Sequence, residues 1–155
     1  MDVKPKIRRA VPDEAELLSE LAFRSKSYWG YSKDFMEFFR AELTYTTDDI
    51  VNKHFFIAFN NRDPLGFYGL NKLLEHEFEL EALFVEPEFI GKGVGRALMN
   101  HAKTTAKELG GKKITILGDP NAQSFYQRSG GQYIGNRESD SIPGRFLPLF
   151  LIELQ

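Results

Sequence analysis

Leu80 to Leu98 reads LEALFVEPEFIGKGVGRAL, and the organisation of the whole chain can be inferred outward from it. The apolar run Leu80–Val85 is typical of a β-strand, whereas Val94–Leu109 carries apolar residues at helical spacing. The turn between these segments contains Gly91, Gly93 and Gly95. The stretch therefore predicts a strand, a glycine-rich turn and a helix in succession.

This succession of elements is typical of an anion-binding site. The first N–H groups of a helix have no partner within the helix, and the helix dipole places partial positive charge beside them. Glycines allow a phosphate group to approach the backbone closely. Lys92 and Arg96 add full positive charges at the same turn. We therefore expect a phosphate to bind over Gly91–Arg96.

Residues 85–95, VEPEFIGKGVG, resemble the acyl-CoA-binding motif of the GCN5-related N-acetyltransferase (GNAT) family, which runs Val-x-Pro, an aromatic residue and Gln/Arg-x-x-Gly-x-Gly/Ala. Ile90 stands where the family carries Gln or Arg. The resemblance implies that backbone N–H groups of this turn hold the pyrophosphate of coenzyme A, and Ile90 still supplies its N–H. It implies contacts to acetyl-CoA from Leu83, Phe84, Val85, Ile90, Gly91, Lys92, Gly93, Val94, Gly95 and Arg96.

Composition predicts one domain over residues 1–155, because 155 residues of which 42% are apolar suffice for one core. A net charge of -2 gives no sign of a nucleic-acid partner. With no cysteine, the chain has no disulfide, no thiolate zinc site and no cysteine nucleophile. No signal peptide or membrane-spanning run is evident, so we expect a cytoplasmic protein without a membrane partner.

Apolar patterns and turn residues predict strands at Lys6–Ala10, His54–Phe59, Leu65–Leu74, Phe78–Val85, Lys113–Leu117, Gln132–Arg137 and Leu147–Leu154. They predict helices from Asp13 to about Lys26, from Lys33 to about Leu43, at Val94–Leu109 and at Asn121–Ser129. The expected fold class is α/β of the α+β type, with about four helices flanking a mixed, mostly antiparallel, twisted sheet of about six to seven strands. A helix joins Leu80–Val85 to Lys113–Leu117, so these two strands should be parallel. The GNAT resemblance implies that this pair is splayed.

Two further burial patterns can be predicted. The long helix should turn Val94, Leu98, Ala102 and Leu109 toward the sheet. The strand Lys113–Leu117 shows no alternation, which is typical of a strand buried on both faces.

The segment Asn121–Gly130, NAQSFYQRSG, loosely resembles the GNAT pattern Asn-x-x-x-x-x-Phe-Tyr-x-x-x-Gly, with a shorter gap before Phe-Tyr. The resemblance implies that Asn121 and Phe125 contact the cofactor and that the Tyr126 hydroxyl is the general acid toward the coenzyme A sulfur. A phenol with a pKa near about 10 suits protonation of a departing thiolate. The alternatives are that Asn121 caps a helix and that Tyr126 is a packed aromatic residue.

Amine acylation needs a base, because an alkylammonium has no lone pair. Glu81 is the first candidate: it lies four residues before Val85, on the same face of a regular strand, and the GNAT resemblance implies a base at that offset. Glu79 is the second candidate. The alternative is that both glutamates pair with Lys or Arg on neighbouring strands. The Val85 N–H would polarise the thioester carbonyl.

The acceptor site is expected at Tyr28, Trp29 and Tyr31, between the first two helices, although these aromatic residues are equally typical of the end of a core. Arg145, in the last hairpin loop, is a candidate contact to an acidic substrate group, and otherwise a solvated loop arginine. His54, His76 and His101 lack the spacing of metal ligands, so we expect no metal.

The resulting hypothesis is an N-acetyltransferase that moves an acetyl group from acetyl-CoA to a primary amine, in a small molecule or a peptide, within a ternary complex. The alternative is a non-catalytic acyl-CoA-binding module. A dinucleotide-binding oxidoreductase fits poorly, because Gly91, Gly93 and Gly95 do not have the spacing G-x-G-x-x-G. A homodimer through the apolar last strand, Phe146–Ile152, is a further possibility.

Overall fold

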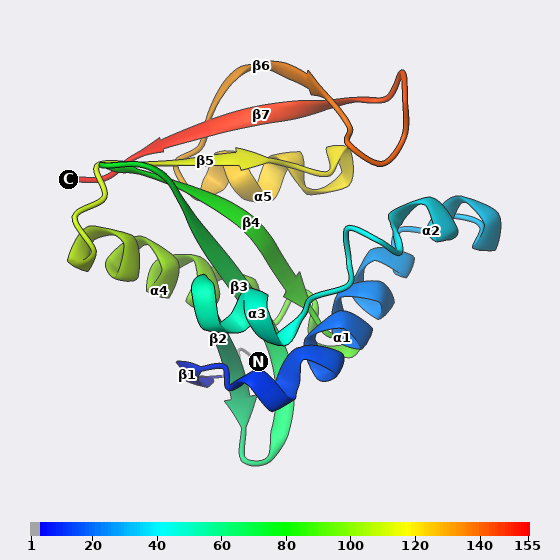
Figure 1. Ribbon diagram of the computed structural model, residues 1–155, viewed down its shortest axis with the longest axis horizontal. Helices are drawn as coiled ribbons and strands as arrows, with labels where there is room; N and C mark the ends of the chain where they lie inside the picture. The colour runs from blue at the N-terminus through cyan, green and yellow to red at the C-terminus, as the bar shows by residue number, and fades with distance from the viewer. Residues whose placement is uncertain (1–3) are drawn as a thin grey trace.

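The computed structural model describes residues 4–155, which form one seven-stranded sheet with the order β1-β2-β3-β4-β5-β7-β6 (Figure 1). The strands are β1 (Lys6–Arg9), β2 (His54–Asn60), β3 (Asp63–Leu74), β4 (Glu77–Val85), β5 (Lys113–Leu117), β6 (Gln132–Glu138) and β7 (Phe146–Glu153). Neighbouring strands are antiparallel except β4 and β5, which are parallel. The predicted mixed sheet with one parallel pair is confirmed.

The α-helices of the described residues are α1 (Ala15–Ser27), α2 (Lys33–Phe39), α3 (Thr47–Asn52), α4 (Val94–Glu108) and α5 (Gln123–Arg128), with short 3-10 helices at Pro12–Glu14, Pro87–Phe89 and Pro120–Ala122. The estimate of about four helices missed α3. The second predicted helix also ends earlier, at Phe39 instead of about Leu43. Leu43 is nevertheless buried, because the turns after Phe39 fold it back onto the core.

The parallel strands β4 and β5 pair only at one end. Their register runs from Glu77 opposite Lys113 to Glu79 opposite Thr115 and then stops. Figure 1 shows the two strands starting side by side and diverging toward the glycine-rich turn. The splay that the family resemblance implied is therefore present.

A β-bulge lies where β4 leaves β5. Gly69 of β3 pairs with Ala82 and the next residue, Leu70, pairs with Leu80, so Glu81 has no partner on β3. An extra residue of this kind bends a strand and increases its twist. The bulge begins two residues after the last β4–β5 pair at Glu79, so β4 turns away from β5 at this point.

The bulge corrects one prediction about side-chain direction. Leu80 belongs to the cluster of buried residues beneath α4, as do the partly buried Leu83 and Val85, whereas Ala82 belongs to the cluster on the α1 side. The alternation of β4 side chains between the two faces of the sheet therefore shifts by one residue at Glu81. Glu81 and Val85 do not share a face, contrary to the prediction for a regular strand.

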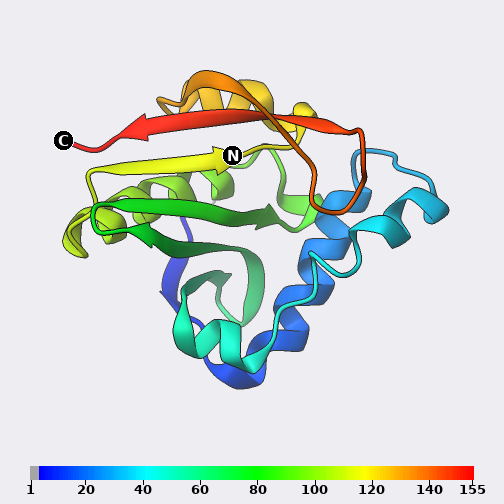
Figure 2. The same cartoon turned by 45° about the horizontal axis from the view of Figure 1, so that its top comes forward.

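Helices lie on both sides of the sheet (Figure 2), and a cluster of buried residues fills each side. One includes Leu98 and Ala102 of α4, and the other includes Leu18 and Leu21 of α1. Leu109 was predicted to face the sheet, but it lies beyond the end of α4 and is 42% exposed. The prediction that β5 is buried on both faces is also wrong. Its residues alternate in burial: Ile114 and Ile116 are buried, whereas Thr115 and Leu117 on the other face are only partly buried.

Candidate active site

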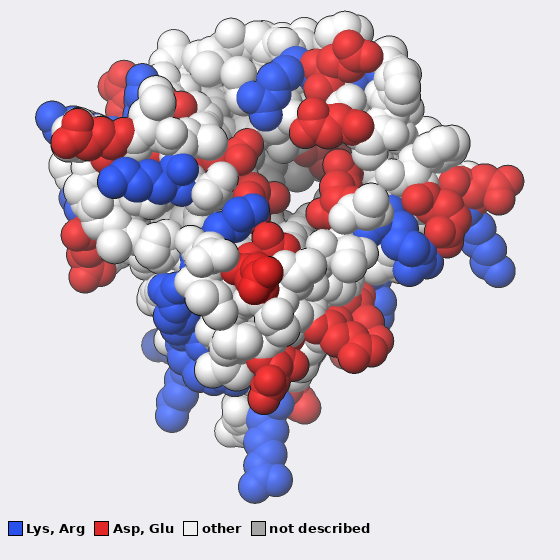
Figure 3. Space-filling view, viewed as in Figure 1, with Lys and Arg blue, Asp and Glu red and all other residues white. Residues whose placement is uncertain are grey.

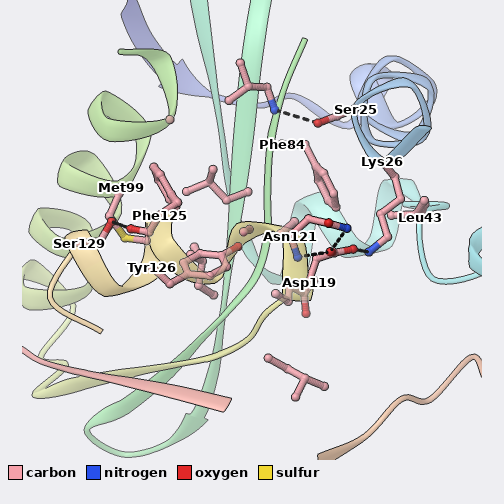
Figure 4. A pocket seen from close by; sticks show the side chains of 18 of the residues that line it. Ser25, Lys26, Leu43, Phe84, Met99, Asp119, Asn121, Phe125, Tyr126 and Ser129 are labelled. Atoms are coloured by element: carbon pink, nitrogen blue, oxygen red, sulfur yellow. Dashed lines mark hydrogen bonds and ion pairs between the residues drawn. The ribbon is translucent and has the colours of Figure 1, made fainter. Parts of the chain in front are cut away.

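A cleft of about 1330 Å³ opens where β4 and β5 diverge. Its walls come from β4, the first turn of α4, the β5–α5 turn, α5 and the C-terminal part of α1. Figure 4 shows these elements around one space, with Phe84, Met99 and Tyr126 at its sides.

The glycine-rich turn forms one end of this cleft. Gly93 precedes α4 with a left-handed φ of 87°, a conformation that side chains other than glycine adopt only at an energetic cost. Its carbonyl accepts the N–H of Ala97, the first backbone bond of the helix. Within residues 4–155 the N–H groups of Val94, Gly95 and Arg96 have no acceptor. These are the free donors that an anion needs.

The cofactor contacts predicted from sequence lie together, with two exceptions. Those whose atoms line the cleft are Leu83, Phe84, Val85, Ile90, Gly91, Gly93, Gly95, Arg96, Asn121, Phe125 and Tyr126. The Lys92 side chain lies over the Phe89 ring, 5.6 Å from its centroid, outside this lining. The Val94 side chain is buried in the core, so only its backbone N–H can serve a ligand.

Tyr126 lies on α5 in the wall of the cleft and is 8% exposed. Gly118 lets β5 approach this ring closely, since a Cβ there would lie 2.9 Å from Tyr126 Cε2. Burial raises the pKa of the Tyr126 hydroxyl, and the negative charge of Asp119 raises it further. The phenol therefore keeps its proton at neutral pH, as a general acid must.

Glu81 lines the cleft and is held by Lys53, whose Nζ lies 3.1 Å from both carboxylate oxygens. Burial raises the pKa of Glu81, and the contact with Lys53 offsets part of that rise. Glu79 also lines the cleft, with its Oε2 3.6 Å from Nη2 of Arg137 on β6. Both glutamates thus form ion pairs with a Lys or an Arg, but not with a partner on a neighbouring strand, because Lys53 follows α3 and β6 is separated from β4 by β5 and β7. A carboxylate with a raised pKa remains suited to accept a proton, so the role of base stays a prediction.

The Val85 N–H donates to Ser25 Oγ at 3.3 Å. Sequence reasoning assigned this N–H to the thioester carbonyl and did not anticipate Ser25. Ser25 lies on α1, is 7% exposed and lines the cleft next to Val85. The distance is long for a hydrogen bond. A carbonyl oxygen that approaches Val85 would have to displace or share this contact.

Asp119 is a second site residue that sequence reasoning missed. Its Oδ2 accepts hydrogen bonds from Lys26 Nζ at 2.6 Å and from the Tyr31 hydroxyl at 2.9 Å. Its Oδ1 accepts the Asn121 backbone N–H at 2.8 Å and side-chain amide at 2.9 Å. Burial opposes ionisation, but Lys26 and these hydrogen bonds together hold the pKa of Asp119 below its usual value. Asp119, and not Asn121, therefore caps the short helix that begins at Pro120.

The aromatic residues expected at the acceptor site separate into different roles. Trp29 lines the cleft, whereas Tyr28 is 51% exposed and lies outside the lining. Tyr31 and Arg145 contact each other and lie outside the cleft lining, since Arg145 Nη2 donates to the Tyr31 hydroxyl at 3.0 Å. Arg145 also lies 5.2 Å from the centroid of the Phe39 ring, so it is neither solvated nor in the cleft lining.

Charge is divided between the two ends of the cleft. The lining residues from α4, α5 and the turn after α5 include cations and no carboxylate: Arg96, Lys103 and Arg128. The other end carries the carboxylates Glu42, Asp49, Glu79, Glu81, Asp119 and Asp140 together with Lys26, Lys53 and Arg137. Figure 3 shows a hollow on this face with acidic side chains around its rim.

Within residues 4–155 no group of three or more His, Asp or Glu side chains is placed to hold a metal ion. No helix of that part of the chain is both long and apolar enough to cross a membrane.

Comparison with known proteins gives consistent matches. A family model described as "Acetyltransferase (GNAT) family" matches residues 23–131. The peptidyl-lysine N-acetyltransferase YjaB of Escherichia coli is 33% identical over 151 residues, with 92% of each chain covered. YjaB of Salmonella typhimurium is 32% identical over 148 residues, covering 92% of this chain and 93% of that protein. The structure of the PaiA N-acetyltransferase of Thermoplasma acidophilum in complex with coenzyme A has the same fold, with a TM-score of 0.80, 22% identity and 97% and 99% coverage.

Proposed function

The chain belongs to the acetyltransferase (GNAT) family, and from this premise we propose that it transfers the acetyl group of acetyl-CoA directly to the side-chain amine of a lysine in a peptide or protein. The observation that carries the proposal is the division of charge within one cleft, with free N–H groups and cations at one end and an excess of carboxylates over cations at the other.

The cationic end suits acetyl-CoA. The free N–H groups of Val94, Gly95 and Arg96 would bind the pyrophosphate oxygens, and the helix dipole adds to their attraction. The gap between β4 and β5 would hold the pantetheine arm, since β4 has no strand partner on that side beyond Glu79. The PaiA structure with coenzyme A supports this choice of donor.

The acidic end suits a cationic acceptor. A protonated lysine is attracted to carboxylates and is brought to them with a higher encounter rate. Both YjaB relatives are named peptidyl-lysine N-acetyltransferases, and they match nearly the whole chain. The carboxylates would repel an acidic small molecule, so we rank acidic molecules last among the candidate acceptors.

In the proposed reaction, Glu81 takes the proton of the lysine ammonium, directly or through one water, and Glu79 is the second choice for this role. The neutral amine attacks the thioester carbon, and the carbon–sulfur bond breaks. The nitrogen loses its second proton, Tyr126 gives its proton to the departing thiolate, and the Tyr126 hydroxyl is then reprotonated. The chain has no cysteine, so no thioester to an enzyme cysteine forms on the way.

The test is an acceptor screen with the full chain and acetyl-CoA. Free thiol is followed over time, and acetylation of lysine peptides is confirmed by mass spectrometry. Matched peptides in which the lysine is already acetylated serve as controls. We expect thiol release over many turnovers only with free lysine, and faster with basic than with acidic flanking residues. Binding of coenzyme A without turnover on any amine would replace the proposal by the non-catalytic module.

A further inference from the structure

Lys53 places a primary amine on the carboxylate that we assign as the base. Its Nζ lies 3.1 Å from Glu81 Oε1 and 3.1 Å from Glu81 Oε2, and 3.7 Å from Asp49 Oδ1. All of these residues line the acetyltransferase cleft together with Leu83, Phe84 and Val85. A general base must lie within hydrogen-bond reach of the proton it removes, directly or through one water. Lys53 Nζ meets this condition without a bound peptide.

We propose that Lys53 is itself an acceptor, so that the protein acetylates its own Lys53 when no peptide occupies the cleft. This inference rests on the proposed function. The acetyl-lysine that forms is a neutral amide and can no longer form an ion pair with Glu81. Self-acetylation therefore releases the Glu81 carboxylate for an incoming peptide lysine.

The reaction balances as an ordinary amine acylation. The Lys53 ammonium loses one proton to Glu81 and from there to solvent, which gives a neutral amine. The amine nitrogen forms a bond to the thioester carbon, the carbon–sulfur bond breaks, and the nitrogen loses its second proton. The thiolate takes a proton from Tyr126, which is then reprotonated. The products are acetyl-Lys53, free coenzyme A and one proton.

The other lysines of the cleft lack this arrangement and serve as internal references. Lys26 is fixed on Asp119 at 2.6 Å, its side chain is 11% exposed, and it lies 4.6 Å from the centroid of the Phe39 ring. Lys103 donates to the backbone carbonyl of Ser129. The Lys53 side chain is 29% exposed, and neither of the other two lysines contacts Glu81.

The experiment incubates the full chain with acetyl-CoA and no peptide, and peptide mapping by mass spectrometry follows each lysine. We expect Lys53 to gain an acetyl group at least about tenfold faster than Lys26 or Lys103, because only Lys53 lies beside Glu81, the carboxylate that we assign as the base. The rate per molecule should not change on dilution, as for a reaction within one cleft. Glu81→Gln and Tyr126→Phe should remove the preference for Lys53, while a melting-temperature shift with coenzyme A shows that each variant is folded.

Two results would overturn the inference. One is acetylation of Lys53 at the rate of Lys26. The other is the same Lys53 rate in the parent chain and in Glu81→Gln, since uncatalysed acetylation needs no base. A lysine peptide assayed alongside separates the two proposals. If the peptide is acetylated and Lys53 is not, self-acetylation fails and the proposed function stands. If neither is acetylated although coenzyme A binds, the proposed function fails as well.

Discussion

At the residue scale, Tyr126 is the clearest test of the chemistry. Tyr126→Phe keeps the ring that packs between Gly118 and Phe150 and removes only the hydroxyl. Loss of a general acid lowers kcat about 100-fold or more. We expect this loss in thiol-release assays with little change in the KM for acetyl-CoA or in the melting temperature. An unchanged kcat would assign protonation of the sulfur to another group.

The pH dependence of kcat/KM tests the proposed role of Glu81 as the base. A base acts only when ionised, so kcat/KM should fall as pH falls through the pKa of Glu81. Burial raises that pKa above the ordinary glutamate value, so activity should be lost at a higher pH than for a solvated glutamate. Glu81→Gln should lower kcat/KM and abolish this acidic limb. Glu79→Gln, measured beside it, should keep the limb, and the reverse pattern would make Glu79 the base.

At the residue scale, sequence reasoning could propose a donor site more readily than the rest of the cleft. The residues of the Val85–Arg96 motif lie close together in the chain, and the free N–H groups at the start of α4 are a local feature that a local pattern can reveal. Ser25 and Asp119 meet their partners across long sequence separations. No local signal marks them, so only the fold could place them in the site.

At the element scale, a matched pair of cations flanks the start of α4, Lys92 in the turn before the helix and Arg96 in its first turn. Arg96 lines the cleft, whereas Lys92 lies over Phe89 outside it. Arg96→Ala should raise the KM for acetyl-CoA about three- to tenfold, with a larger effect at low salt, because an exposed cation is screened by ions. Lys92→Ala should change it much less. Equal effects of the two variants would contradict the placement of the phosphates at this end of the cleft.

The helix α3 shows what an element-scale pattern could have revealed. Thr46 Oγ1 accepts the Asp49 N–H at 3.1 Å, and the Asp49 carboxylate accepts the Thr46 N–H at 2.9 Å. This reciprocal capping is readable from a threonine followed three residues later by an acidic residue. The helix propensity of so short a segment gave no further support for a helix, and α3 was not predicted.

At the scale of the whole molecule, the network around Asp119 joins α1, the loop after α1, the β5–α5 turn and the β6–β7 loop. Asp119→Asn retains a capping side chain and removes the charge, so Lys26 loses its buried partner. We expect the free energy of unfolding to fall by about 3 kcal/mol in denaturant titrations. Glu37→Gln, which breaks the exposed pair with Arg40, should cause no measurable loss.

The pH dependence of that stability has a definite sign. The folded-state pKa of Asp119 lies below its usual value of 3.8. Its contribution is therefore complete above the unfolded-state pKa and is lost as pH falls through the lower folded-state pKa. The parent chain should lose more stability than Asp119→Asn on acidification below about pH 4. Parallel losses in the two proteins would contradict this role.

The parallel pair of β4 and β5 could be predicted from the succession of elements, because a helical crossover requires parallel strands. The bulge at Glu81 could not, since it depends on how Gly69 and Leu70 of β3 meet β4. This one extra residue turns Glu81 to the face opposite Val85, toward Lys53. The arrangement of the acceptor half of the cleft follows from it.

The most direct measurement is a titration of the 15N-labelled chain with coenzyme A, followed by the backbone amide resonances. The N–H groups of Val94, Gly95 and Arg96, which have no acceptor within residues 4–155, should move most as they bind the pyrophosphate. Pantetheine, which lacks the pyrophosphate, should leave them nearly unchanged. If coenzyme A binds while these amides stay in place, the account of the donor site is wrong.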